Sequence, residues 1–413
     1  MFSRRDSDRE PRWSWSRLAP TGRRRLVAAG VAVVVLGTLI GVRVHLRGDS
    51  GCDSADDRDL TLTVTVAPTL AEPLRALAAD FSAGRAGPGG RCVHVEVAEA
   101  ESSAVLTAIA TPSAPDPDVP GDVWIPESAD WLTLALDSRT ATSAVPPSSI
   151  AIASTPVVIA MPRPMAEQLG WPDREFGWAD LFAGSGSTAF WPDAGKPEWG
   201  PFKVGFADPE NSTAALRAVI GVVSARHGIP PAQIDDTTFD RDRSVQFDVL
   251  TMERGAALLP ETSSELFAAL WAAEKDGTGD STPEESSPEE SGTEGEATAG
   301  DRPAAAGPPA PLSAFPAYEY EVLAYNRGVG SPTGQPPGTP LVAFYPPDAL
   351  FATTVPYVVM PRAGRTPARA SAATAFGEYL RGADGQSVLR AAGLRSPAGD
   401  PPSPDAAAAG QAA

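Results

Sequence analysis

The stretch of sequence that decides the fold is residues 118–132, DVPGDVWIPESADWL. Its apolar run 122–125 has the length of a buried strand, and Pro126 lacks the amide that would continue a sheet ladder. Ser128 follows at once, before apolar residues at near-helical spacing, and is therefore expected to be a helix N-cap. A strand that leads directly into a helix ends in free backbone amides, and ligands of open α/β sheets usually bind at such strand ends.

Two further strand-then-helix units precede this stretch. LTLTVTVA at 60–67 alternates Thr with aliphatic residues and predicts a strand, after which Thr69 is expected to cap a helix. CVHVEV at 92–97 predicts the second strand, and the helix after it is expected to begin at Ser102 or Ser103. Three such units in succession predict an α/β fold with a parallel sheet and right-handed crossovers.

A second α/β region is expected between two similar extended segments, PVVIAMPR at 156–163 and PYVVMPR at 356–362. A chain that leaves one lobe and later returns to it needs two such connections, so this pair predicts a two-lobed protein with a two-strand hinge. Strands are expected at 202–207 and 256–259. The polar residues at the strand-to-helix junctions that follow them are Asp208, Asn211, Ser212, Thr213, Glu261 and Thr262.

The composition of the 413 residues limits the classes of function. With 42% hydrophobic residues, the chain can bury the core of one large or two medium domains. Its formal net charge of -19 argues against nucleic acid as a partner, because the phosphates would be repelled. The scarcity of histidine, and the lack of a GK[ST] sequence after GSGST at 184–188, argue against an enzyme, and no catalytic residues are assigned.

The amino-terminal part predicts a membrane anchor. Residues 26–42, LVAAGVAVVVLGTLIGV, are uncharged and would span roughly 26 Å as a helix, just enough for a bilayer core. The arginine-rich segment 1–25 before them is expected to stay in the cytoplasm, so that the rest of the chain lies outside the cell. A cleaved signal peptide is the alternative, but Arg43 and Arg47 stand where small residues of a cleavage site would be needed.

The two cysteines, Cys52 and Cys92, both lie outside the membrane in this topology. An oxidising compartment favours a disulfide between them, and two unpaired buried thiols are the alternative. The three histidines, His45, His94 and His227, show no metal-ligand spacing, so no metal site is expected.

Composition also marks the expected domain boundaries. The acidic stretch 274–311, rich in Ser, Pro and Gly, predicts a disordered insert, and the segment 318–325 fits either a strand or a helix. The expected organisation in chain order is a cytoplasmic segment (1–25), a transmembrane helix (26–42), a stalk (43–59), the first part of lobe 1 (60–155), lobe 2 with the insert (156–355), the return of lobe 1 (356–399) and a disordered tail (400–413).

Several motifs in this order carry a resemblance to a known family. They are DVWIPESADW (122–131), VGFADPENSTAAL (204–216), ALLPETS (257–263), LVAFYPPD (341–348) with VPYVVMP (355–361), GLRSPAG (393–399), and the pair Cys52 and Cys92. Together they resemble the type 2 periplasmic-binding-protein fold, in particular the membrane-anchored extracellular solute-binding domains of actinobacteria, which are relatives of molybdate-binding proteins. The resemblance implies a small-molecule ligand in a cleft between two α/β lobes. It also suggests a link to ABC-type transport, with a transporter or another membrane protein as partner.

The chain also departs from this family. It has no DxSxS metal site of the von Willebrand A domain that some relatives carry, so an adhesion role is not carried over. The molybdate-type pattern holds an oxyanion with small hydroxyl residues, and the matching positions are Thr69, Ser128 and Ser212 or Thr213. The carboxylates beside them, which would repel an anion, are Glu127, Asp208, Glu210 and Glu261. An amine, a metal ion or a polyhydroxylated neutral compound therefore fits better, although carboxylates at helix starts also serve as caps.

The sequence thus predicts a membrane-anchored extracellular solute-binding or sensing protein. The expected ligand-binding residues are Thr69, Glu127, Ser128, Asp208, Asn211, Ser212, Thr213, Glu261 and Thr262. The alternative is a non-catalytic interaction or scaffold ectodomain that kept the fold but lost its ligand, whose cleft would be filled by side chains.

Overall fold

A computed structural model of the protein describes residues 60–84, 92–111, 120–277, 310–361 and 366–404. The expected anchor 26–42, the stalk 43–59 and most of the acidic insert lie outside these ranges, so the predictions made for them are not tested. Within the described ranges, no helix is both long and apolar enough to cross a membrane.

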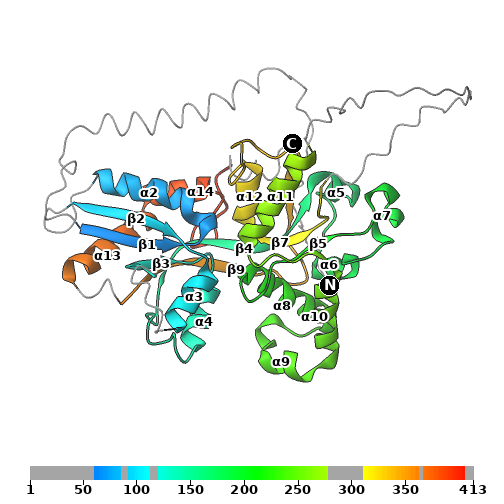
Figure 1. Cartoon of the computed structure of the whole chain (residues 1–413), viewed down its shortest axis with the longest axis horizontal. Coiled ribbons are helices and arrows are strands. Elements are labelled where there is room, and N and C mark those ends of the chain that lie inside the picture. Colours follow the sequence, from blue (N-terminus) through cyan, green and yellow to red (C-terminus); the bar gives the residue numbers. More distant parts are fainter. Residues whose placement is uncertain (1–59, 85–91, 112–119, 278–309, 362–365, 405–413) are drawn as a thin grey trace, which may run out of the picture. The chain divides into compact units, whose positions relative to one another are not determined.

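A seven-stranded sheet forms the centre, with strand order β2-β1-β3-β9-β4-β7 and β8 also paired with β4 (Figure 1). The strands are β1 (Leu60–Val66), β2 (Val93–Glu99), β3 (Val123–Ile125), β4 (Ile150–Pro162), β7 (Phe315–Tyr318), β8 (Leu341–Phe344) and β9 (Ala352–Val359). A second, parallel sheet pairs β5 (Val204–Gly205) with β6 (Ala256–Leu258).

The sheet is mixed, which corrects the expectation of a parallel one. β1 runs parallel to β2 and β3, but β9 runs antiparallel to β3 and β4, and β7 and β8 run antiparallel to β4. The three local strand-then-helix units were predicted correctly. The antiparallel strands return from distant parts of the chain, and their direction is not contained in any local pattern.

β4 and β9 lie side by side and connect the two α/β regions (Figure 1). The first half of β4, up to Pro156, pairs with β9 in the sheet of β1 to β3, and its second half, from Val157, pairs with β7 and β8. This arrangement fits the two connecting segments expected from the sequence at 156–163 and 356–362. Their action as a hinge, and the lobe boundaries, stay predictions.

The helices follow the strands and cover the sheets. They are α2 (Ala71–Gly84), α3 (Ser102–Ala110), α4 (Ala129–Asp137), α5 (Arg163–Gln168), α6 (Trp178–Gly184), α7 (Phe190–Asp193), α8 (Thr213–His227), α9 (Asp236–Arg241), α10 (Arg243–Gly255), α11 (Ser263–Gly277), α12 (Glu319–Asn326), α13 (Pro367–Arg381) and α14 (Ala383–Ala391). Three short 3-10 helices are η1 (Pro68–Leu70), η2 (Pro197–Trp199) and η3 (Pro231–Gln233).

The core explains why these elements hold their places. β1 buries Leu62, Val64 and Val66 completely, and Leu74 and Phe81 of α2 are buried in the same apolar cluster. The residues Trp124 and Trp131, which could have lined a cleft, are buried in a separate apolar cluster with α3 and β9. They are therefore core residues, although the ring nitrogen of Trp131 also donates a hydrogen bond to the Glu127 carboxylate.

Candidate functional site

Five strand-to-helix junctions form the candidate site, at β1–η1, β3–α4, β5–α8, β6–α11 and β7–α12. Three of them carry a hydroxyl cap from the predicted set. Ser128 Oγ accepts a hydrogen bond from the Asp130 amide at 3.0 Å, and Ser212 Oγ accepts one from Ala215 at 3.3 Å. Thr262 Oγ1 accepts from the Glu265 amide at 3.2 Å. The predicted cap at Ser128 is confirmed.

The predicted cap at Thr69 is wrong. Pro68 opens a 3-10 turn there, its N-cap residue is Ala67, and no side chain caps it. The Thr69 hydroxyl is instead hydrogen bonded to the Tyr320 hydroxyl at 2.6 Å. A proline has no amide to cap, so the chain tightens into a 3-10 turn before α2 begins.

Glu127, at the end of β3, is the centre of a polar cluster. Ser102 Oγ and Trp131 Nε1 both donate hydrogen bonds to its carboxylate, and Thr213 Oγ1 lies 3.5 Å from it. Burial raises the pKa of Glu127, although these donors oppose the rise. The carboxyl group is thus held in place from α3, α4 and α8.

Two tyrosines from the β7–α12 junction fill the middle of the site. The hydroxyl of Tyr318 lies 2.6 Å from Thr213 Oγ1, and that of Tyr320 lies 2.6 Å from Thr69 Oγ1. The two rings stack with centroids 5.9 Å apart, and both side chains are almost completely buried. Burial raises the pKa of both tyrosines well above its ordinary value, so both hydroxyls stay neutral.

An ion pair joins α4 to α8 at the edge of this cluster. The Arg217 guanidinium donates two hydrogen bonds to the Asp130 carboxylate, one of them at 2.9 Å, and lies 5.6 Å from the Phe351 ring centre. The hydrogen bonding of the Arg217 guanidinium to the Asp130 carboxylate raises the pKa of Arg217. Since α4 and α8 follow strands of different sheets, this pair links the two α/β regions.

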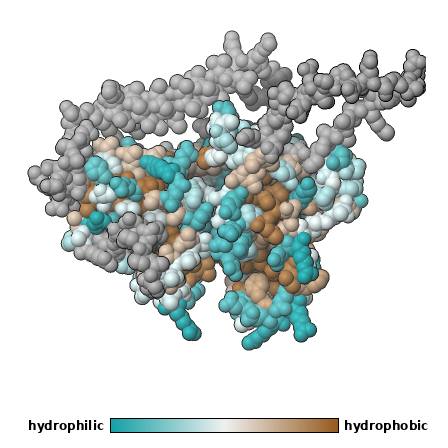
Figure 2. Space-filling model, in the orientation of Figure 1, coloured by the Kyte–Doolittle hydropathy of each residue, from teal (hydrophilic) through white to brown (hydrophobic). Residues whose placement is uncertain are grey.

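An open groove of about 800 Å³ lies between α3 and the start of α11. Its acidic and polar lining residues are Glu101, Ser103, Thr107, Thr111, Asn211, Glu261, Thr262, Ser264 and Glu265. No lysine or arginine lines it among the residues that the structure describes. Burial raises the pKa of Glu101, and the neighbouring charges of Glu265 and Glu99 add to the rise. Teal, hydrophilic residues gather on this part of the molecular surface (Figure 2).

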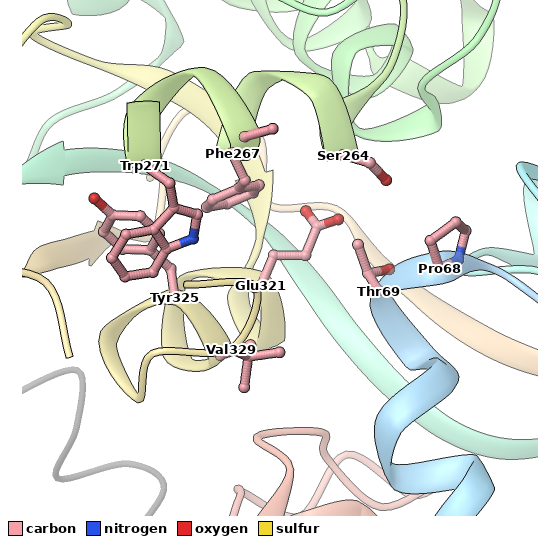
Figure 3. A pocket seen from close by; sticks show the side chains of 11 residues that line it. Pro68, Thr69, Ser264, Phe267, Trp271, Glu321, Tyr325 and Val329 are labelled. Atoms are coloured by element: carbon pink, nitrogen blue, oxygen red, sulfur yellow. The ribbon is translucent and has the colours of Figure 1, made fainter. Parts of the chain in front are cut away.

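A smaller cavity of about 220 Å³ lies on the other side of Ser264 (Figure 3). Its wall is mainly apolar and is made by Phe267, Trp271, Tyr325 and Val329, with Thr69 at one end. The buried carboxyl of Glu321 points into it. Because Ser264 and Ala268 line both spaces, the cavity and the groove are neighbours across the first turns of α11.

The structure brings most of the predicted site residues together, in two groups. Thr69, Glu127, Ser128 and Thr213 surround the stacked tyrosines, and Ser128 also bonds Thr353 of β9 at 3.0 Å. The second group lines the groove and consists of Asn211, Glu261 and Thr262. Ser212 lies beside that group, and its hydroxyl is hydrogen bonded to the Ser263 hydroxyl, with the two oxygens 2.8 Å apart.

Asp208 is placed elsewhere. Its carboxylate accepts hydrogen bonds from the Glu210 amide at 2.9 Å and from Asn211, as a turn-forming Asp does. It lines a different cavity, of about 440 Å³, with Val249 of α10, with Leu259 and with Glu261, which also lines the groove. A contact between Asp208 and a ligand stays a prediction.

Sequence reasoning missed the β7–α12 junction. The sequence of segment 318–325 fits either a strand or a helix. In the structure β7 ends at Tyr318 and α12 begins at Glu319. Glu321 accepts a hydrogen bond from the Tyr318 amide at 2.9 Å and so forms half of a capping box. A glutamate three residues after the last strand residue was the available signal. Ser264 and Glu101 carried no such signal.

The described part of the chain contains Cys92 but no cluster of metal ligands. No group of three or more His, Cys, Asp or Glu side chains could hold a metal ion in the described part of the chain. Cys92 is buried at the start of β2, where its carbonyl accepts a hydrogen bond from Leu60, and it is not a free cysteine. Since Cys52 lies outside the described residues, the Cys52–Cys92 disulfide stays a prediction.

Part of the chain matches the model of a known family. Residues 62–252 match the family model described as bacterial extracellular solute-binding protein. A search of curated proteins gave no match.

Among solved structures, the chain is similar to the sulfate-binding protein SubI from Mycobacterium tuberculosis, with 16% identity, a TM-score of 0.49, and coverage of 84% of this chain and 89% of that one. AfuA from Actinobacillus pleuropneumoniae, with fructose-6-phosphate bound, matches at 10% identity and a TM-score of 0.48, covering 82% and 85%. Iron-bound HitA from Pseudomonas aeruginosa matches at 14% identity and a TM-score of 0.45, covering 85% and 95%. At these values, the similarities say nothing about the ligand of this chain.

The family match runs from β1 to α10 and includes the β3–α4 and β5–α8 junctions, which hold Glu127, Ser128 and Thr213. The resemblance to solute-binding proteins noted from the sequence is confirmed by this match over residues 62–252.

Proposed function

We propose that this protein captures a small solute outside the cell, in the groove and the neighbouring cavity on the two sides of Ser264. The supporting observation is the convergence of strand-to-helix junctions on one place. Ser264 lines both spaces, Thr69 reaches the cavity, and Asn211 and Thr262 reach the groove. Junctions of this kind present backbone amides and short polar side chains, which are the groups that orient small ligands.

The charge of the site favours a cationic or neutral solute over an oxyanion. Glu101, Glu261 and Glu265 line the groove, Glu321 lies in the cavity, and no basic side chain is among the described lining residues. An anion entering this space would meet several carboxylates at low dielectric and be repelled. Amines and polyhydroxylated neutral compounds are the remaining classes, because no group of side chains in the described residues could hold a metal ion.

A thermal-shift screen of the full-length protein tests this proposal. Sugars, amines, divalent metals and oxyanions are added at millimolar concentration, and a solute that binds the folded state raises Tm by an amount that grows with the ratio of its concentration to its Kd. We expect stabilisation by an amine or a neutral polyol and none by sulfate or molybdate. Stabilisation by oxyanions alone would contradict the charge argument, and the absence of any stabilising solute would contradict the proposed function.

A second candidate, an interaction ectodomain without a solute, is favoured by one observation. Several hydroxyls of the predicted ligand set are already bonded inside the protein: Thr69 to Tyr320, Thr213 to Tyr318, and Ser212 to Ser263. Side chains thus fill the middle of the site. Co-purification of a membrane protein, together with no solute effect on Tm, would support this candidate.

The anchor and the transport role belong to the same proposal. Residues 26–42 would hold the protein in the cell membrane as a single-pass helix, with residues 1–25 in the cytoplasm and the solute-binding region outside. The protein would deliver the captured solute to a transporter in the same membrane. We infer no catalytic step, since the proposed site needs none.

A further inference from the structure

The 220 Å³ cavity combines two features that select one class of solute (Figure 3). Its wall contains the side chains of Phe267, Trp271 and Tyr325, with the Trp271 and Tyr325 ring centroids 4.3 Å apart. Its acidic group is Glu321, which is 4% exposed. A cavity of about 150 Å³ is enough for a benzene molecule, so this one can accept an apolar group of similar or larger size.

The carboxyl of Glu321 has no cationic partner in the described lining of the cavity. One of its oxygens accepts the hydrogen bond from the Tyr318 amide at 2.9 Å. Figure 3 shows the carboxyl group facing the space between Phe267, Ser264 and Thr69. A buried carboxylate without a positive charge is unfavourable, and a cation placed beside it removes this cost. Aromatic faces nearby add attraction for the same cation.

We propose that this cavity binds a cationic amine with an apolar substituent, with the ammonium group on Glu321 and the substituent against Trp271, Phe267 and Val329. The proposal rests on the solute-binding function above and narrows its solute class. Ser264 and Thr69 would accept the remaining ammonium hydrogen bonds, since a hydroxyl oxygen is an acceptor for such donors. The acidic groove next to Ser264 would attract the amine towards the cavity.

The alternative role of Glu321 is structural, because it also completes the capping box of α12. Glu321→Gln separates the two roles. A glutamine oxygen accepts the Tyr318 amide hydrogen bond as a glutamate oxygen does, so the cap is kept and only the charge is lost. This variant is therefore expected to fold, and a change in its amine affinity reports the charge.

The protonation state of Glu321 gives a second test. Burial raises its pKa to about 8, and the neighbouring acids Glu127 and Glu101 add to the rise. The other titratable groups near it are Tyr320, beside it on α12, and Tyr325, one turn further along the same helix. Because an ammonium ion pairs with the ionised form, binding should weaken as the pH falls below 8, by roughly 20-fold between pH 8.5 and pH 6.5.

Isothermal titration calorimetry of the full-length protein with n-pentylammonium, 1-pentanol and pentanoate tests the proposal. We expect one molecule of n-pentylammonium per chain at pH 8.5, weaker binding of the neutral alcohol by at least about 10-fold, and no binding of the anion. Lengthening the alkyl chain by one methylene should tighten binding about fourfold until the cavity is filled.

The variants decide the outcome. Glu321→Gln should lose the preference for the ammonium over the alcohol and its pH dependence, whereas Glu378→Gln, an exposed site on α13, should behave as the wild type. Equal ammonium affinity in Glu321→Gln and wild type would overturn the proposal. If no alkylammonium binds while another solute in the thermal screen does, this inference fails and the proposed function stands; if no solute binds at all, both fail.

Discussion

Glu321 shows how one residue can be both a structural and a binding group. It caps α12 through the Tyr318 amide, and it places a carboxyl group in a mainly apolar cavity. The first role is local and can be predicted from the spacing of a capping box. The second depends on α11, which lies about fifty residues away in the sequence, and could not be predicted from the residues around Glu321.

The free energy of unfolding should depend on pH through the titration of Glu321. Its pKa is about 8 in the folded state and is raised from 4.5, so between these values the folded state keeps a proton that the unfolded state has released. The free energy of unfolding therefore falls as the pH rises through this window, by up to about 5 kcal/mol for this group. Glu321→Gln should remove this loss and be more stable than the wild type at pH 8.5 but not at pH 4.5.

Chemical denaturation of both proteins at several pH values measures this difference. Other groups titrate in the same range, but they are shared by the two proteins and cancel in the comparison. A difference in stability that does not change between pH 4.5 and pH 8.5 would mean that the pKa of Glu321 is the same in the folded and unfolded states, and the pKa argument would be wrong.

At the scale of elements, the strand-to-helix junctions explain which parts of the site were predictable. Ser128 was predicted as a cap because the strand end, the cap and the apolar spacing lie within a few residues of each other. The Thr69 cap failed because Pro68 changes the first turn. The Tyr318 junction was ambiguous because strand and helix meet inside a single short aromatic segment.

Replacing Ser128 by alanine should have two effects. Loss of the cap on the Asp130 amide and of the hydrogen bond to Thr353 should lower the free energy of unfolding by about 1–2 kcal/mol. It should also weaken solute binding, because α4 holds Trp131 against Glu127. Thr366→Ala removes a cap from α13, away from the site, and should lower stability by a similar amount with no effect on binding. Equal binding by both variants would exclude a role for the α4 cap.

The position of Thr213 depends on the packing of α8 against α6. A Cβ atom on Gly221 would lie 2.6 Å from the Trp178 ring, so Gly221→Ala should shift α8 and cost about 1–3 kcal/mol of stability. Gly338→Ala, where nothing lies within 4 Å of the new atom, should stay within about 0.5 kcal/mol of the wild type. Thermal denaturation measures both. A Gly221→Ala protein as stable as Gly338→Ala would show that α8 is not tightly held.

At the scale of the whole described region, β4 and β9 connect two α/β regions, and the Asp130–Arg217 ion pair joins α4 to α8 across them. The sequence predicted two connecting segments from the repeated PVVIAMPR and PYVVMPR patterns. It did not predict that β4 is one continuous strand, or that its two halves pair with different partners, since both depend on contacts with β7, β8 and β9.

Weakening this ion pair should loosen the connection between the regions. Arg217→Lys cannot make two parallel hydrogen bonds to Asp130, so amide hydrogen exchange in α4 and at the start of α8 should become faster. Because both side chains are partly exposed, the cost in stability should be at most about 1 kcal/mol. Arg75→Lys, which weakens a pair between neighbouring α2 and β2, is the control and should leave α4 and α8 unchanged. Unchanged exchange in Arg217→Lys would mean that other contacts hold the regions together.

The most direct test of the central claim, that the strand-to-helix junctions share one solute site, is amide hydrogen exchange of the full-length protein with and without the solute that raises Tm most. The account predicts that the solute slows exchange together at the starts of α3, α11 and α12 and at Asn211, just before α8, because residues there line the groove and the cavity. Protection confined to another part of the surface, such as the cavity lined by Trp171, Glu175 and Arg395, with no change at these helix starts, would contradict it.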